Sequence, residues 1–330
     1  MTARGALLAG SVAMVATASL GCGEDATCRG VVAIGAAMQK AALLKADGSV
    51  WTWHPGADDP TRVFTAPDAT GFENAQMCLR MSDRYVWCDP SYLAVNSRVR
   101  ELPSLAHLSS WWDAPAESDC AVLQDGSLTC TFSTEPTFAE RAVGIRNVAV
   151  GAWHFCAIAT DGALVCQPAG PGAGDWSSAG AGLTDVVEVV SYAKPPDSTV
   201  RTASGELWSL HQVGVGAEFP VERTQITGID GAIQQLVGGF DFACALVSEG
   251  DVYCWVVGDG TSGDVILQVK SLARRVPQKI ASLPQPATAL AAGQSSVCAL
   301  LRDTTVWCWG IVGGDGKSGR PEGGYVEACD

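Results

Sequence analysis

Cysteine is the residue whose spacing in this chain points most directly to chemistry. Two chemistries use paired cysteines: disulfide formation and metal binding. Five cysteines are each followed by another ten positions later: Cys78 and Cys88, Cys120 and Cys130, Cys156 and Cys166, Cys244 and Cys254, and Cys298 and Cys308. Zinc sites usually take two thiolates from a Cys-x-x-Cys turn, which this spacing lacks. The spacing therefore favours disulfides, and we predict no metal and no cofactor.

The residues between the paired cysteines predict the element that positions them, a β-hairpin. A turn signal lies midway between the partners, as in Gln124-Asp125-Gly126 and Thr160-Asp161-Gly162. Alternating apolar residues around an Asp-Gly turn are typical of two antiparallel strands. Directly opposed residues in such a hairpin lie close enough for a disulfide. Each pair is therefore predicted to join the strands of one hairpin and to contribute about 2–3 kcal/mol of stability.

The hairpin recurs seven times, and two of the copies lack both cysteines. Ala42 and Thr52 take their places in the first copy, and Thr199 and Ser209 in the fifth. Residues that pack independently would not be expected to disappear in pairs. The two partners of a disulfide would, because a single remaining thiol has no role in an oxidising compartment. The joint loss therefore supports the disulfide interpretation.

The period of the repeat predicts the architecture. From Thr52 to Cys308 the second cysteine position recurs about every 43 residues, which accommodates the four strands of one propeller blade. A strand is also predicted before several hairpins, as at Val148-Ala149-Val150-Gly151. Helix-period patterns are scarce, and the 37 glycines favour many tight turns. The sequence therefore predicts an all-β fold: a seven-bladed β-propeller of four-stranded blades with disulfide-stapled hairpins, occupying residues 30–330 as one domain.

The N-terminal segment is predicted to direct export. Arg4 precedes an uncharged stretch of apolar and small residues over 5–20, which is short for a membrane span. The stretch ends in Ser19-Leu20-Gly21-Cys22, which resembles a bacterial lipobox, although Leu is usual where Ser19 stands. We therefore expect a signal peptide over residues 1–21 and a lipid on Cys22.

The parity of the cysteines supports lipid attachment. The chain has 13 cysteines, of which ten form the hairpin pairs. Cys28 and Cys329 stand at the two ends of the mature chain and are predicted to close the ring as a disulfide. Cys22 is then a lone thiol, which lipid attachment would remove. We expect a monomer in the cell envelope, at the outer membrane, anchored by lipid alone through a tether over residues 22–29. Cleavage after Ala18 with plain secretion is the alternative.

The repeated motif resembles the regulator of chromosome condensation repeat. It reads Val-Ala-x-Gly, His-x-Cys-Ala, Asp-Gly and Val-Trp-Cys-Trp-Gly, with the best copies at residues 148–166 and 290–310. The resemblance covers nearly the whole mature chain and implies a seven-bladed propeller. The family's namesake is an exchange factor for a small GTPase and binds chromatin, whereas a secreted bacterial β-lactamase inhibitor has the same propeller. An acidic, exported and disulfide-rich chain is closer in compartment to the inhibitor.

Charge and motif content exclude several classes of function. The 35 acidic and 21 basic residues give a formal charge of −14, which repels nucleic acids. No zincin, nucleophile-elbow or Walker segment occurs, so no catalytic residue is predicted. His154 takes the place of the repeat's histidine and is expected to form a hydrogen bond within its blade. An envelope enzyme with its site in the propeller funnel is the alternative function.

The candidate binding residues are those that vary while the framework repeats. The positions three and four before the first cysteine differ in every copy, and Met38, Trp153, Phe240 and Asp241 are the candidate binding rim. Equivalent loops of a ring converge on one face, and large apolar residues on a surface loop often mark binding. We therefore expect a module that binds an envelope or extracellular protein or a glycan, as an adhesin, scaffold or inhibitor. Drift of unconstrained loops is the alternative explanation.

Overall fold

A computed structural model describes the parts of the chain that form the repeated framework. These are residues 30–37, 40–53, 60–73, 78–82, 86–88, 105–111, 118–132, 135–151, 154–168, 177–178, 183–192, 197–212, 221–257, 276–280, 283–294, 296–310 and 326–327. The regular elements in these ranges are all strands. Over the same residues, no helix has the length and apolar character needed to cross a membrane.

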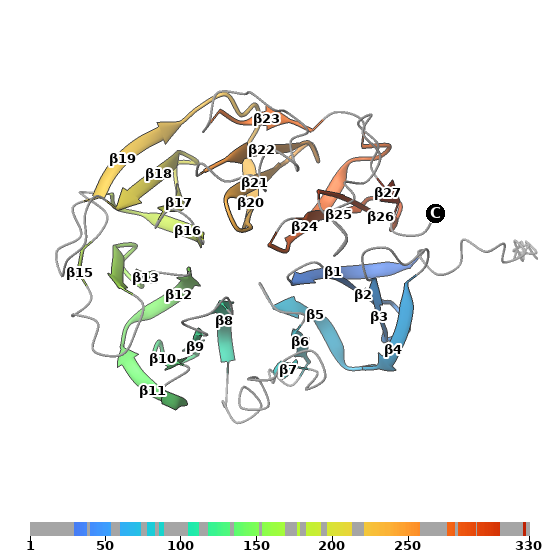
Figure 1. Cartoon of the computed structure of the whole chain (residues 1–330), viewed down its shortest axis with the longest axis horizontal. Helices are drawn as coiled ribbons and strands as arrows, with labels where there is room; N and C mark the ends of the chain where they lie inside the picture. Colours follow the sequence, from blue (N-terminus) through green and yellow to red (C-terminus); the bar gives the residue numbers. More distant parts are fainter. Residues whose placement is uncertain are drawn as a thin grey trace, which may run out of the picture.

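Seven sheets follow one another around a ring, as Figure 1 shows. Blade one contains β1 (Val31–Ala37), β2 (Lys40–Lys45), β3 (Ser49–Trp53) and β4 (Thr61–Thr65). Blade two contains β5 (Ala69–Glu73), β6 (Cys78–Met81) and β7 (Val86–Cys88). Blade three contains β8 (Leu105–Trp111), β9 (Ser118–Leu123), β10 (Leu128–Phe132) and β11 (Glu135–Ala142). The fourth strand expected for blade two falls on residues 89–104, outside the described ranges.

The remaining four blades have four strands each. Blade four contains β12 (Ile145–Val150), β13 (His154–Ala159), β14 (Leu164–Pro168) and β15 (Ser177–Ser178). Blade five contains β16 (Val186–Ser191), β17 (Asp197–Thr202), β18 (Leu207–Gln212) and β19 (Val221–Ile226). Blade six contains β20 (Ile233–Gly238), β21 (Phe242–Val247), β22 (Val252–Val256) and β23 (Gln278–Lys279). Blade seven contains β24 (Ala287–Ala292), β25 (Ser296–Leu301), β26 (Val306–Gly310) and β27 (Val326–Glu327). The predicted seven-bladed all-β propeller is confirmed.

The strand order gives the ring two distinct faces. In every blade the strands pair in chain order, and the first strand lies at the centre of the ring (Figure 1). The turns between second and third strands, such as Thr160–Gly162, therefore lie at one face, which we call the turn face. First strands end and second strands begin at the opposite face, as at Gly151 and His154, and we call this the loop face.

The hairpin disulfides form as the cysteine spacing predicts. Cys156 and Cys166 are directly opposed in the ladder of β13 and β14, with their Cα atoms 4.1 Å apart. Three other pairs are bonded in the same register: Cys120–Cys130, Cys244–Cys254 and Cys298–Cys308. Cys78 is also disulfide-bonded, and Cys88 lies opposite it in the ladder. The remaining predicted sites, Cys22, Cys28 and Cys329, lie outside the described residues.

The hydrophobic core lies between the blades, and the disulfides are part of it. Cys120 and Cys130 of blade three belong to one buried cluster with Val148 and Phe155 of blade four. Blades six and seven share a similar cluster, which includes the fully buried Phe242. Burial of apolar surface between sheets is the main favourable term in the packing of such a ring.

Candidate functional site

A candidate site lies in the channel at the centre of the ring. Its cavity volume is about 140 Å³, and the first strands of all seven blades line it. Most of its wall is apolar or backbone, as at Ala36 and Val150. Among the described residues that line it, the titratable side chains are Glu73, His107 and Glu188. These are the groups from which a catalytic or binding site in the propeller funnel would have to be built.

A β-bulge at the same place in every first strand prepares these positions. In β12 the ladder register shifts between Ile145 and Asn147, and the equivalent shift occurs in β1, β5, β8, β16, β20 and β24. A bulge bends its strand and changes the direction of the next side chain. The third residue of each first strand follows this shift, and His107, Glu188 and Gln235 occupy that position.

The side chains at this third position join each blade to the next one. His107 Nε2 donates a hydrogen bond to the carbonyl oxygen of Val148 at 3.0 Å. Glu188 Oε1 accepts the backbone N–H of Leu236 at 2.9 Å. Val148 and Leu236 are each the fourth residue of the first strand in the following blade. These polar groups therefore satisfy the exposed backbone edge of a neighbouring strand, which would otherwise lack a partner.

Gln235 makes the most complete contact of this kind. Its Nε2 donates to the carbonyl oxygen of Leu290 at 2.9 Å, and its Oε1 accepts the N–H of the same residue at 2.9 Å. One amide thus binds both backbone groups of one residue in blade seven. Sequence reasoning missed this repeated contact, because the third position carries four different polar side chains and three small residues around the ring.

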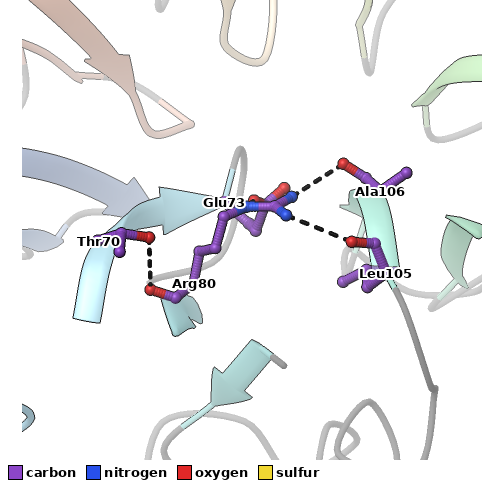
Figure 2. A network of polar contacts seen from close by, with 5 residues as sticks. All are labelled: Thr70, Glu73, Arg80, Leu105 and Ala106. Carbon is purple, nitrogen blue, oxygen red and sulfur yellow. Dashed lines mark hydrogen bonds and ion pairs between the residues drawn. The ribbon is translucent and has the colours of Figure 1, made fainter. Parts of the chain in front are cut away.

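Glu73 is held by an arginine that also spans two blades, as Figure 2 shows. Arg80 Nε forms an ion pair with Glu73, which is 8% exposed. Its terminal nitrogens donate to the carbonyl oxygens of Leu105 at 3.3 Å and Ala106 at 2.9 Å in blade three. Thr70 donates its hydroxyl to the Arg80 carbonyl oxygen at 3.1 Å. Arg80 therefore neutralises the channel carboxylate and fastens blade two to blade three.

The electrostatics of His107 agree with a structural role. Burial lowers its pKa, and the charge of Glu73 partly opposes that effect. Because the Val148 carbonyl can only accept, Nε2 of His107 carries the proton. Glu188 likewise has an ion pair with Arg201 at 2.9 Å. The three titratable groups of the channel are thus engaged in contacts that hold the blades together.

A cluster of polar side chains lies buried between blades four and five. His154 Nε2 lies 2.7 Å from Ser198 Oγ, which in turn lies 3.0 Å from Ser191 Oγ. A serine and a histidine at this distance could in principle act as nucleophile and base. However, His154 is 3% and Ser198 is 2% exposed, and His154 Nδ1 has no hydrogen-bond partner to orient the ring. The pair therefore joins two blades. The predicted hydrogen bond of His154 exists, but its partner is in the next blade and not in its own.

The candidate binding rim is only partly covered by the described residues. Met38 and Trp153 lie outside them. Phe240 lies at the loop face with its side chain partly exposed, and its N–H donates to the Gln294 carbonyl oxygen of blade seven at 2.9 Å. Asp241 is fully buried, so its inclusion in an exposed rim was wrong. The residue directly precedes β21, and its side chain is shielded from solvent.

No metal centre emerges from this arrangement. Over the described ranges, no group of three or more His, Cys, Asp or Glu side chains could hold a metal ion. The cysteines of the four described disulfide pairs, and Cys78, are disulfide-bonded and so do not provide thiolate ligands.

One copy of the repeat matches a known protein family. Residues 233–255, which run from the start of β20 into β22, match the family model described as the regulator of chromosome condensation (RCC1) repeat. These residues carry an RCC1 repeat. The resemblance inferred from the repeated motif is confirmed, and no curated protein matches the chain in sequence.

Solved structures share the propeller fold at low sequence identity. Human WBSCR16 has a TM-score of 0.60 at 13% identity, over 83% of this chain and 88% of that one. The propeller domain of Cps50 (Swd1) from Myceliophteria thermophila has a TM-score of 0.52 at 10% identity, over 86% of this chain and 97% of that one. Yeast RCC1 (Prp20) bound to Kap60 has a TM-score of 0.48 at 16% identity, over 84% and 69%. At such identities, the likeness to the first two structures concerns the propeller fold alone.

Proposed function

We propose that this chain is a cell-envelope lipoprotein whose propeller binds a protein or a glycan at its loop face. The observation that carries the proposal is that the titratable side chains of the channel already have structural partners. Glu73, His107 and Glu188 are all engaged in contacts between or within blades. An enzyme in the funnel would need convergent groups that remain free to act on a substrate. A binding module needs only a rigid framework that presents variable loops.

The two chain ends support this orientation of the molecule. Gly30, just before β1, accepts the N–H of Ala46 at the turn face. Glu327 pairs with Trp307 near the start of β26, which also lies toward the turn face. Cys22 stands eight residues before Gly30, a span of at most about 28 Å. A lipid on Cys22 would therefore hold the turn face toward the membrane and leave the loop face directed outward.

The loop face carries the residues that we propose for binding. Phe240 is partly exposed there, and Met38 and Trp153 occupy the equivalent loops in the sequence. Aromatic side chains on an otherwise polar surface are frequent anchors in protein and glycan interfaces. The turns at the opposite face are short and repeat an Asp-Gly pattern, as at Asp125-Gly126 and Asp161-Gly162.

Site-specific photocrosslinking in living cells tests the binding proposal. A photoreactive aromatic amino acid replaces Phe240 at the loop face, and a control protein carries it in place of Ala203, which is exposed at the turn face. We expect a discrete adduct from position 240, competed by excess unlabelled propeller, and none from position 203. Equal adducts from both positions, or an adduct from position 203 alone, would contradict the proposed binding face.

Lipid attachment is tested independently of binding. Expressed with its own signal in a bacterium, the protein is expected in the detergent phase after phase separation. Cys22→Ala is expected to release the protein into the aqueous phase or to stall its processing. Equal solubility of both proteins, with a mature chain that begins at Ser19, would establish plain secretion.

A further inference from the structure

The ring has one junction at which the chain does not continue from one blade to the next. The described strands of blade one are β1–β4 and those of blade seven are β24–β27, so the two blades share no strand. An apolar cluster joins them, with Val31 and Ile34 packed near Leu300 and Val306. We call this junction the seam. Within the part of the chain that the structure describes, its two sides are held together by non-covalent contacts, so polar groups that cross it have particular weight.

At three other junctions, a glycine in the hairpin turn binds the next blade through its backbone. The carbonyl oxygen of Gly126 accepts the N–H of Ile145 at 2.9 Å. The same bond runs from Val186 to Gly162 at 3.1 Å, and from Ala287 to Gly250 at 2.9 Å. In each case the donor is the first residue of the following blade's first strand. The hairpin turn thus acts as the contact point between consecutive blades.

These turns require a left-handed backbone, which explains their glycines. Gly126, Gly162 and Gly250 have φ values of 84°, 86° and 87°. Gly48 and Gly205 occupy the same position with φ values of 77° and 87°. Glycine adopts this conformation without a steric penalty, whereas β-branched residues rarely do.

Blade seven departs from this rule with a threonine. Thr304 occupies the turn position of the glycines and has a φ of 69°. Its N–H donates to the carbonyl oxygen of Leu301 at 3.0 Å, as the N–H of Gly126 does to Leu123. A glycine would therefore make the same turn without strain. What the threonine adds is its hydroxyl, which accepts the N–H of Gly30 across the seam at 3.0 Å.

We propose that Thr304 is a ring-closing latch, whose side chain binds the start of blade one where no connecting chain holds it. Gly30 is the last residue before β1, and its own carbonyl accepts the N–H of Ala46 within blade one. The hydroxyl of Thr304 therefore fixes the first residue of the ring to its last hairpin turn. A β-branched residue in a left-handed conformation, where the equivalent described turns have glycine, is evidence of such a specific role.

Peptide-level hydrogen exchange on the oxidised, full mature chain tests the latch. Thr304→Gly removes the hydroxyl and also the backbone strain. If the latch acts, the peptide over residues 30–37 exchanges about two- to tenfold faster, as expected for the loss of one hydrogen bond. Thr304→Ser keeps the hydroxyl and is expected to exchange within about twofold of the wild type. Thr304→Val keeps the branched shape without the hydroxyl and is expected to resemble Thr304→Gly.

The matched control relieves backbone strain at a different junction. Asp185 has a φ of 59° directly before β16, and Asp185→Gly is expected to leave exchange over residues 30–37 unchanged. Exchange in Thr304→Gly that is equal to or slower than in the wild type would overturn the latch, because strain relief alone predicts that result. Equal acceleration in Thr304→Ser and Thr304→Gly would overturn it as well.

Discussion

His154 and Ser198 belong to neighbouring blades, and their side chains lie 2.7 Å apart in the buried interface between blades four and five. Cys156, one partner of the blade-four disulfide, has its Sγ atom 3.7 Å from the same Ser198 oxygen. The imidazole of His154 and the Cys156–Cys166 disulfide therefore both lie close to the Ser198 hydroxyl at this interface. Its protonation is expected to affect how blades four and five pack.

The stability of the propeller should depend on pH through His154. Burial lowers the pKa of His154 from 6.5 to about 4, so the unfolded chain binds a proton at this residue that the folded chain does not. The contribution of neutral His154 to the free energy of unfolding is therefore fully present above pH 6.5. It is lost as the pH falls from 6.5 toward 4. The loss at pH 4.5 is on the order of 2–3 kcal/mol by linkage. His154→Gln should show a smaller decline, measured by urea unfolding at pH 7 and pH 4.5 without reductant. Identical declines in both proteins would contradict this role.

Blade five has a position at which an additional disulfide should form. Thr199 and Ser209 are directly opposed in β17 and β18, in the register that the cysteines hold elsewhere, and their buried hydroxyls have no hydrogen-bond partner. The pair Thr199→Cys and Ser209→Cys is expected to form a disulfide and to raise the free energy of unfolding by about 2–3 kcal/mol. Non-reducing mass spectrometry and denaturant unfolding measure both effects.

The Cys156–Cys166 disulfide provides the matched comparison for the engineered disulfide. Replacing Cys156 and Cys166 together by alanine should lower stability by about 2–3 kcal/mol. Replacing Cys156 alone should be more harmful, because the remaining thiol can exchange with other disulfides. If two free thiols persist at positions 199 and 209 under oxidising conditions, the equivalence of the blades at this position is wrong.

Arg80 should matter more for its geometry than for its charge. Arg80→Met leaves Glu73 without its cation and frees the carbonyl oxygens of Leu105 and Ala106, so we expect a loss of about 2–3 kcal/mol. Arg80→Lys keeps the charge but has one terminal nitrogen where arginine has three, so it cannot reach all three acceptors at once and should recover only part of this loss. The double change Arg80→Met and Glu73→Gln should be less harmful than Arg80→Met alone. Thermal unfolding of the wild type, Arg80→Met, Glu73→Gln and the double variant measures the coupling, and strictly additive effects would contradict it.

The hairpins and their disulfides could be predicted because the signal lies within one short segment. Cys156 and Cys166 are ten residues apart with an Asp-Gly turn between them, and hairpin pairing is a local consequence of that pattern. The number of blades followed from counting this unit. The same locality explains why Thr199 and Ser209 could be assigned to cysteine positions in a blade that has no cysteine.

The contacts of the channel could not be predicted, because they depend on two strands that are distant in sequence. Gln235 stands nine residues before Cys244, but His107 stands thirteen before Cys120, so loop length hides their equivalence. The β-bulge that directs these side chains leaves no mark in the residue types. The burial of Asp241 is a similar case, since a residue next to a variable loop can belong either to the loop or to the blade.

The last prediction concerns the covalent closure of the seam by Cys28 and Cys329. Gly30 is bound to Thr304 in the turn before β26, and Glu327 pairs with Trp307 near the start of the same strand. Each cysteine is two residues beyond one of these anchored positions, a reach of about 7 Å on each side. We therefore expect a disulfide between them, with a stabilisation of about 5 kcal/mol in the chain-entropy model because the closed loop is long.

Mass spectrometry of unreduced tryptic peptides should find the peptides of Cys28 and Cys329 linked within a monomer. The double variant Cys28→Ser and Cys329→Ser should unfold more readily and should exchange faster over residues 30–37, because the seam then depends on Thr304 and on apolar packing alone. Adding Thr304→Gly to that variant should increase exchange further, since the latch and the disulfide hold the same junction. Free thiols at both positions, or disulfide-linked oligomers in place of the monomer, would show that the ring closes without this bond.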